Sequence, residues 1–133
     1  MLYNIHTGVG VHQKPQRDIV YLVSTVERVH GAGLPFVFTD RHAYVANATY
    51  FSNPSDLTRL DWALIRGRDF RRDPNRPDKM DLRAAEFLVH QQFPVEALAG
   101  VACFDDAQTD SIRAEVATRS LTMSVKTVRG WYF

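Results

Sequence analysis

The sequence predicts an α+β domain with a strand-rich core, and three observations lead to that prediction. Short apolar runs rich in β-branched and aromatic residues recur along the chain, which is typical of buried strands. Short segments with helix-capping residues lie between these runs. The 133 residues are 45% hydrophobic and 23% charged, an ordinary composition for one globular domain. We therefore expect residues 1–133 to form a single domain in which strands alternate with short helices.

The individual elements follow in chain order. Strands are expected at residues 2–6, 18–23, 35–39, 86–90, 101–104, 121–128 and 131–133. Helices are expected from the capping box at 24–27, over 41–46 after Asp40, over 55–65 ending at Gly67, and over 105–119 with Ile112 and Val116 facing inward. Pro74 and Pro77 exclude a regular helix from 68 to 81.

The segment from Arg66 to Arg83 concentrates positive charge in a chain whose net charge is only +1. It contains seven Lys or Arg and four Asp residues, a net of +3, which leaves −2 for the remainder. Arginine binds phosphate through two parallel hydrogen bonds, so this local excess favours an anionic partner. The interleaved Asp residues support a second interpretation, a solvated loop whose charges pair with one another. Both interpretations remain open.

Several other kinds of site are disfavoured by the sequence. Cys103 is the single cysteine, which rules out an internal disulfide, and its apolar surroundings predict a buried, inert thiol. The histidines show no zinc-ligand spacing, so we expect no metal. Neither a signal peptide nor an apolar run of membrane-spanning length is apparent. A cytoplasmic protein with no membrane contact is expected.

Two side chains are candidates for chemistry. Glu86 opens an apolar strand directly after the basic segment, a position that suits a carboxylate for binding a hydroxyl or taking a proton. The alternative for Glu86 is a solvent-facing side chain on an amphipathic strand. His42 follows Asp40, and a histidine at a helix start usually has a structural role. The nearby aromatic residues Tyr44, Tyr50 and Phe51 are interpreted as core rather than as a base-stacking platform.

Six motifs occur in an order that resembles the DarT family of DNA-modifying ADP-ribosyltransferase toxins. They are residues 1–8 (MLYNIHTG), 19–23 (IVYLV), 34–43 (LPFVFTDRHA), 60–62 (LDW), 85–89 (AEFLV) and 130–133 (GWYF). Each motif alone is weak, and the ordered set covers essentially the whole chain. The resemblance implies an ADP-ribosyltransferase-like mixed fold with a strand-rich core and short peripheral helices.

The resemblance also implies the reaction and its residues. NAD would be the donor substrate, and a base in single-stranded DNA, thymine in the best-known members, would be the acceptor. Glu86 matches the catalytic glutamate of the family, and His42 matches a histidine near the active centre that would bind NAD. Segments that would contact DNA comprise Met1, Leu2, Tyr3, Asn4, Ile5, His6, Arg71, Arg72, Asp73, Pro74, Met80, Asp81, Leu82, Arg83 and Ala84.

A partner and a departure complete the implications of the resemblance. The antitoxin DarG, a macrodomain protein, is the expected partner of a monomeric toxin. Family members carry a further N-terminal part, with a His-x-Thr motif and a catalytic arginine that contacts NAD, and neither maps onto this sequence. We expect residues 1–133 to correspond to the C-terminal two-thirds of the family domain. The alternative function is therefore a truncated, non-catalytic remnant that binds DNA or the antitoxin.

Overall fold

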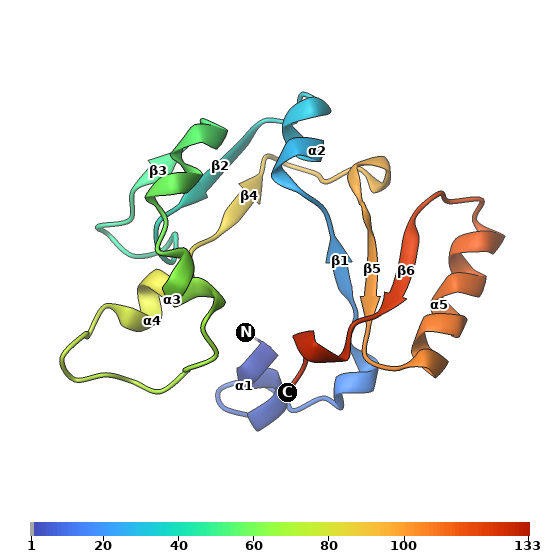
Figure 1. The fold of residues 1–133 in the computed structure, drawn as a ribbon, viewed down its shortest axis with the longest axis horizontal. Helices are drawn as coiled ribbons and strands as arrows, with labels where there is room; N and C mark the ends of the chain where they lie inside the picture. Colours follow the sequence, from blue (N-terminus) through green and yellow to red (C-terminus); the bar gives the residue numbers. More distant parts are fainter. Residues whose placement is uncertain (1) are drawn as a thin grey trace. The chain divides into compact units, whose positions relative to one another are not determined.

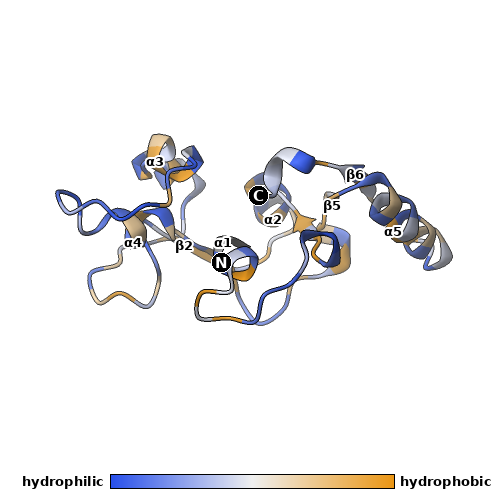
Figure 2. Ribbon diagram, turned by 90° about the horizontal axis from the view of Figure 1, so that it is seen from below, coloured by the Kyte–Doolittle hydropathy of each residue, from blue (hydrophilic) through white to orange (hydrophobic). Residues whose placement is uncertain are grey.

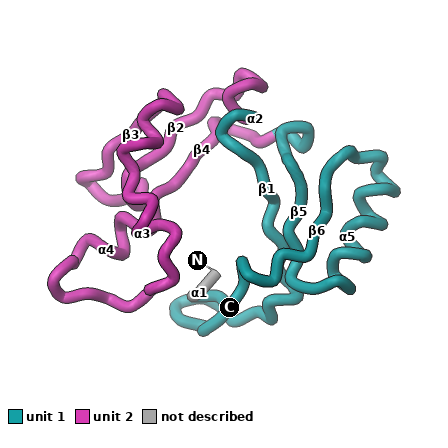
Figure 3. The backbone as a smooth tube through the Cα atoms, in the orientation of Figure 1, with its two compact units in different colours: residues 1–28, 94–133 teal, residues 29–93 magenta. Residues whose placement is uncertain are grey.

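The computed structural model describes residues 2–133, with side chains from Asn4 onward, and divides into two compact units (Figure 3). Unit 1 combines the N-terminal residues up to Arg28 with Pro94–Phe133, and unit 2 is the continuous segment Val29–Phe93. Each unit contains one three-stranded sheet within the described residues. The chain therefore enters unit 2 once and returns to complete unit 1.

Unit 1 is built on a mixed sheet of strand order β1-β5-β6 (Figure 1). β5 (Gly100–Cys103) pairs antiparallel with β1 (Tyr21–Val23) and parallel with β6 (Ser124–Thr127). All four residues of β5 are buried, and Figure 2 colours this strand as hydrophobic. Gly100 is required by close packing, because a Cβ there would lie 2.3 Å from the Ser124 carbonyl oxygen.

Helix α5 (Asp106–Thr118) covers this sheet. Ile112 and Val116 pack against the core residues Val101, Cys103 and Val125, which confirms the predicted inward face. The remaining elements of unit 1 are short: α1 (Leu2–Thr7), the 3-10 turns Gln16–Asp18, Val95–Ala97 and Arg129–Trp131, and the first half of α2 (Val26–Gly31), whose second half belongs to unit 2.

Unit 2 is built on an antiparallel sheet of order β3-β2-β4. Its strands are β2 (Phe36–Thr39), β3 (Tyr50–Phe51) and β4 (Phe87–Val89). Phe38 is fully buried and stacks on Phe51 and Phe87, with ring centroids 5.2 and 6.3 Å away. A 3-10 helix (Pro54–Arg59), α3 (Trp62–Arg66) and α4 (Lys79–Arg83) lie in the long connection between β3 and β4.

The predicted α+β class is confirmed, as are five of the seven predicted strands, four of them shorter than predicted and the fifth, β5, shifted by one residue. Two strand predictions are wrong. Residues 2–6 form α1, because a short alternating segment fits a helical turn as well as a strand and Gly8, with a φ of 75°, ends the helix. Residues 131–133 form no strand: Trp131 ends a 3-10 turn that begins at Arg129, and Tyr132 after it is buried in the core.

Two helix predictions also need correction. The Asp40 side chain accepts a hydrogen bond from the Thr49 amide at 2.9 Å, so it closes the loop between residues 40 and 49, and residues 41–46 form turns instead of a helix. The helix expected over 55–65 is interrupted at Leu60, because Asn53 caps a 3-10 helix and Asp61 caps α3 separately. Among residues 2–133, no helix combines the length and apolar character needed to cross a bilayer.

A candidate active site and its neighbouring loop

Glu86 lies immediately before β4 in unit 2, and its carboxylate is held at one oxygen only. Oε2 accepts a hydrogen bond from the Ala43 amide at 2.9 Å, whereas Oε1 has no partner among the described residues. The side chain is 38% exposed. One carboxylate oxygen is thus fixed by the backbone, and the other is available to a ligand.

Thr39, at the end of β2, fixes the backbone of Glu86 from both sides. The Thr39 amide donates to the Glu86 carbonyl at 2.9 Å, and the Glu86 amide donates to Thr39 Oγ1 at 3.1 Å. The Thr39 hydroxyl in turn donates to the Arg41 carbonyl at 2.5 Å. Thr39 is completely buried, so these bonds are protected from water. Sequence reasoning missed this residue, because a threonine at a strand end carries no signal of its own.

His42 lies beside Glu86, and its backbone connects the site to α4. Nδ1 of His42 is 3.6 Å from Glu86 Oε2, but it accepts a hydrogen bond from the Tyr44 amide at 3.2 Å. An accepting Nδ1 carries no proton, so the pair is not an ion pair in this arrangement. The His42 amide donates to the Asp81 carbonyl at 2.9 Å. Glu86, His42 and α4 therefore lie close together.

Hydrogen bonds between residues of the basic segment hold this loop in one conformation. Lys79 is buried, and its Nζ reaches both Asp69 Oδ2 at 3.0 Å and the Arg71 carbonyl at 2.9 Å. Asp69 also binds Arg71 Nε at 2.8 Å. Hydrogen bonds from Arg71 and then from Lys79 hold the pKa of Asp69 well below its usual value. Part of the predicted self-pairing of loop charges is thus present.

The arginines of this segment divide into paired and unpaired side chains. Arg76 forms an ion pair with Asp61 at 3.5 Å. Arg83 turns inward, where Nη1 donates to the Leu64 carbonyl at 2.5 Å and the guanidinium lies 4.4 Å from the ring centroid of Phe70. Arg72 is exposed and makes no hydrogen bond, ion pair or ring contact within residues 2–133.

A surface cavity of about 490 Å³ lies beside Arg72. It is lined by Arg72, Asp73, Pro74, Arg76, Pro77, Met80 and Asp81. Five of these positions are among the residues expected to contact DNA, and the other expected members of unit 2 are Arg71, Leu82, Arg83 and Ala84. Since Asp81 also binds His42, the cavity and the Glu86 neighbourhood meet at one residue.

The N-terminal segment expected to contact DNA belongs to unit 1. Met1 lies outside the described residues, as do the side chains of Leu2 and Tyr3. The Asn4 carbonyl accepts from the Gly8 amide at 2.7 Å, the Ile5 carbonyl accepts from the Lys14 amide at 3.3 Å, and the ring of His6 stacks on Phe133 at 5.8 Å. This segment is thus packed against both a loop and the C-terminal residue of its own unit.

The aromatic residues near Glu86 depart from the sequence interpretation. Phe51 is buried as expected, but Tyr44 is 94% exposed and Tyr50 is 56% exposed. The Tyr50 hydroxyl donates to the Ala43 carbonyl at 2.6 Å, and this hydrogen bond stabilises the loop. In the part of the chain that the structure describes, no three His, Cys, Asp or Glu side chains cluster in a way that could hold a metal ion.

Comparison with known proteins gives a consistent result. A family model described as "ssDNA thymidine ADP-ribosyltransferase, DarT" matches residues 1–133. The chain is 41% identical over its whole length to a DNA ADP-ribosyl transferase of Escherichia coli O127:H6 (strain E2348/69 / EPEC) and 40% identical over 78% of its length to one of Thermus sp. (strain 2.9). It spans 62% and 48% of these two relatives, less than two thirds of their length.

Solved structures of Thermus sp. 2.9 DarT are also similar. Complexes with carba-NAD+ and with ADP-ribosylated ssDNA each superpose with a TM-score of 0.89 at 30% identity, covering 99% of this chain and 67% and 63% of theirs. The match confirms the mixed fold that the motif order implied.

Proposed function

We propose that this chain, which belongs to the DarT family, is an NAD-dependent ADP-ribosyltransferase that modifies thymine in single-stranded DNA and acts as the toxin of a toxin–antitoxin system. The observation that carries the proposal is the Glu86 carboxylate, anchored through Oε2 and free at Oε1 beside the basic loop. The family description and the relatives bound to NAD+ and to ADP-ribosylated ssDNA support the same chemistry.

Glu86 has two tasks in this proposal. As the bond between ribose C1′ and nicotinamide breaks, positive charge develops on the sugar, and a fixed carboxylate that holds the ribose 2′-hydroxyl stabilises that charge. A ring nitrogen of thymine then forms the new bond to C1′ after giving up its proton, and we assign the acceptance of that proton to Glu86. Nicotinamide leaves with the electron pair of the broken bond. We assign His42, next to Glu86, to the NAD side of the site.

DNA contact is assigned to two sets of residues. In unit 2 the set comprises Arg71, Arg72, Asp73, Pro74, Met80, Asp81, Leu82, Arg83 and Ala84, and in unit 1 it comprises residues 1–6. The cavity beside Arg72 and the unpaired charge of that side chain support the first set. A base in a single strand is already unpaired, so no flipping cost opposes its entry into the site.

The proposal extends to the setting in which the chain works. We propose a cytoplasmic monomer whose 133 residues act as one domain and whose partner is the antitoxin DarG. A single buried cysteine, Cys103, fits a reducing compartment. Co-purification with DarG, and a mass measured by light scattering, would test the partner and the monomer separately.

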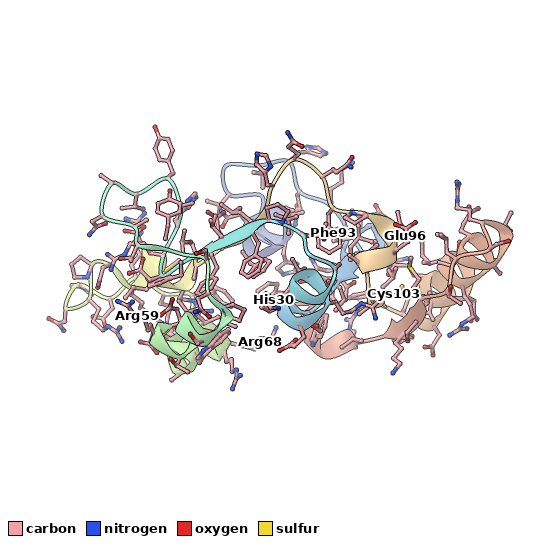
Figure 4. The ribbon with its side chains drawn as sticks, turned by 90° about the horizontal axis from the view of Figure 1, so that it is seen from above. His30, Arg59, Arg68, Phe93, Glu96 and Cys103 are labelled. Carbon is pink, nitrogen blue, oxygen red and sulfur yellow. The ribbon has the colours of Figure 1, made fainter. Side chains whose placement is uncertain are left out.

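Transfer of label from NAD to a single-stranded oligonucleotide tests the reaction directly. We expect the 133-residue chain to label thymine-containing strands, and Glu86→Gln to lower the rate by about 10²–10³-fold or more. Glu96→Gln, the same change at an exposed carboxylate of unit 1 (labelled in Figure 4), is the matched control. Equal labelling by the wild type and Glu86→Gln, or none by the wild type, would reject the proposal.

One observation favours a second function, a non-catalytic remnant that binds DNA or the antitoxin. Arg72 is exposed and without a partner in residues 2–133, and a surface cavity lies beside it, an arrangement that favours binding of an anionic strand with or without NAD. Calorimetric titration of the chain with NAD separates the two functions. Measurable NAD affinity would eliminate the remnant, and DNA binding without NAD affinity would favour it.

A further inference from the structure

Tyr44 is the most exposed large hydrophobic side chain in the described part of the chain, with 94% of its surface open to solvent. Burial of an aromatic ring away from water lowers the free energy, so such exposure in a folded protein needs an explanation. Single exposed apolar residues are common on protein surfaces. Whether the exposure of Tyr44 has a function therefore depends on where the residue lies in the fold.

The loop around Tyr44 is fixed by its own hydrogen bonds, so the exposure of the ring is imposed by the backbone. Asp40 closes the loop on the Thr49 amide, and the Val45 amide donates to the His42 carbonyl at 3.0 Å. The Tyr44 amide donates to the His42 ring. These bonds hold the backbone on both sides of Tyr44, and the ring points into solvent.

The same loop contacts the candidate catalytic carboxylate one residue away from Tyr44. Ala43 gives its amide to Glu86 Oε2 at 2.9 Å, and its carbonyl accepts the Tyr50 hydroxyl at 2.6 Å. Consecutive Cα atoms are about 3.8 Å apart, so the backbone that carries the Tyr44 ring lies next to the residue whose amide anchors Glu86. Tyr50 is bound by its hydroxyl, whereas the ring of Tyr44 has no aromatic or cationic contact within residues 2–133.

We propose that Tyr44 is a stacking platform that receives a base of the single-stranded DNA beside Glu86. Every nucleobase presents a flat face to an aromatic ring, and stacking of this kind binds single strands without paired hydrogen bonds. A ring at this position orients the acceptor base while Arg72 holds a phosphate of the same strand. The inference rests on the proposed function, because it takes the ligand class from that function.

Binding measured without NAD tests the inference apart from catalysis. Two labelled single-stranded oligonucleotides of equal length are used, one carrying thymines and one carrying only abasic sugars and phosphates. We expect Tyr44→Ala to weaken binding of the first by about 5- to 150-fold, the range that ~1–3 kcal/mol of stacking produces. Binding of the abasic strand should change by less than about twofold, because it offers no base to stack.

Two further variants complete the design. Tyr44→Phe keeps the ring and should bind both strands within about twofold of the wild type. Phe93→Ala removes a 39% exposed ring elsewhere in unit 2 (Phe93 is labelled in Figure 4). This variant should also bind both strands within about twofold of the wild type. Since Tyr44 is almost fully exposed, the melting temperature of Tyr44→Ala should match that of the wild type.

Equal losses on both strands, or no loss on either, would overturn the inference. Absence of DNA binding by the wild type would overturn it as well. The outcomes separate it from the proposed reaction. A base-dependent Tyr44 effect without any label transfer would reject the reaction and keep the platform, whereas transfer that is insensitive to Tyr44→Ala would keep the reaction and reject the platform.

Discussion

A single buried hydroxyl, that of Thr39, determines where Glu86 lies. Thr39→Val preserves the side-chain volume but leaves the Glu86 amide and the Arg41 carbonyl without their partner. Unpaired buried groups cost about 1–3 kcal/mol, so we expect a loss of that size in the free energy of unfolding, measured with urea. Transfer should fall in kcat with KM little changed, and Thr39→Ser should restore it. A stability loss with unaltered kcat would show that Thr39 supports the fold alone.

Arg71 and Arg72 are adjacent and have the same side chain, but their contacts in the structure differ. Asp69 binds Arg71, whereas Arg72 has no partner in residues 2–133. We expect Arg72→Ala to reduce the salt dependence of single-strand binding by about 0.7 in the log–log slope, the contribution of one phosphate. Arg71→Ala should change the slope less and disturb the loop more. Identical slopes for the two variants would contradict this distinction.

At the scale of elements, the bond from Lys79 to Asp69 determines whether the basic loop keeps its shape. The pKa of Asp69 is depressed by hydrogen bonds from Arg71 and Lys79. A depressed carboxyl pKa contributes stability above its unfolded-state value, about 3.9, and the contribution falls as the pH drops toward the folded-state value. We therefore expect Asp69→Asn to lower the unfolding free energy at pH 7 and to lower it less at pH 3.

Asp110→Asn provides the control for that comparison, because Asp110 pairs with Arg113 on an exposed face of α5. Exposed pairs of this kind contribute little, so this variant should follow the wild type at both pH values. An Asp69→Asn effect that is equal at pH 7 and pH 3 would show that the carboxylate charge is not what holds the loop.

The elements that sequence reasoning predicted well are those with a local cause. The apolar runs became β2, β4 and β5, and Asp105 caps α5 through the Gln108 amide at 2.8 Å. Elements with a long-range cause were missed. Asp40 looked like a helix cap, yet its partner is the amide of Thr49, nine residues away. Local patterns cannot distinguish these two uses of one carboxylate.

The candidate site was predictable to a similar extent. Glu86 and His42 were singled out from the sequence and given their roles by the resemblance, and the structure brings His42 Nδ1 within 3.6 Å of Glu86 Oε2. The role of Ala43 was not predictable, since it acts through its backbone amide alone. The exposure of Tyr44 was predicted wrongly, because an aromatic residue among apolar neighbours is usually buried and only the fixed turns of the loop keep it out.

At the scale of the whole chain, the order of strands depends on contacts that no local pattern encodes. Tyr21 pairs with Ala102, and Gly100 pairs with Ser124, so unit 1 is assembled from the two ends of the sequence, which unit 2 separates along the chain. Tyr132 secures this arrangement from the C-terminal end. Its hydroxyl lies 3.1 Å from the Ile19 carbonyl and 2.9 Å from that of Ala102.

The ionisation of Tyr132 should therefore report on the integrity of unit 1. Burial raises the pKa of Tyr132 to about 12, with smaller contributions from Cys103 and Tyr21. A raised tyrosine pKa contributes stability below the unfolded value, about 10, and loses it as the pH rises through the folded value. We expect Tyr132→Phe to be less stable than the wild type at pH 8. The gap in stability between the two proteins should narrow between pH 10 and 12. Thermal unfolding across that range measures the gap, and a constant gap would show that the hydroxyl proton is not coupled to folding.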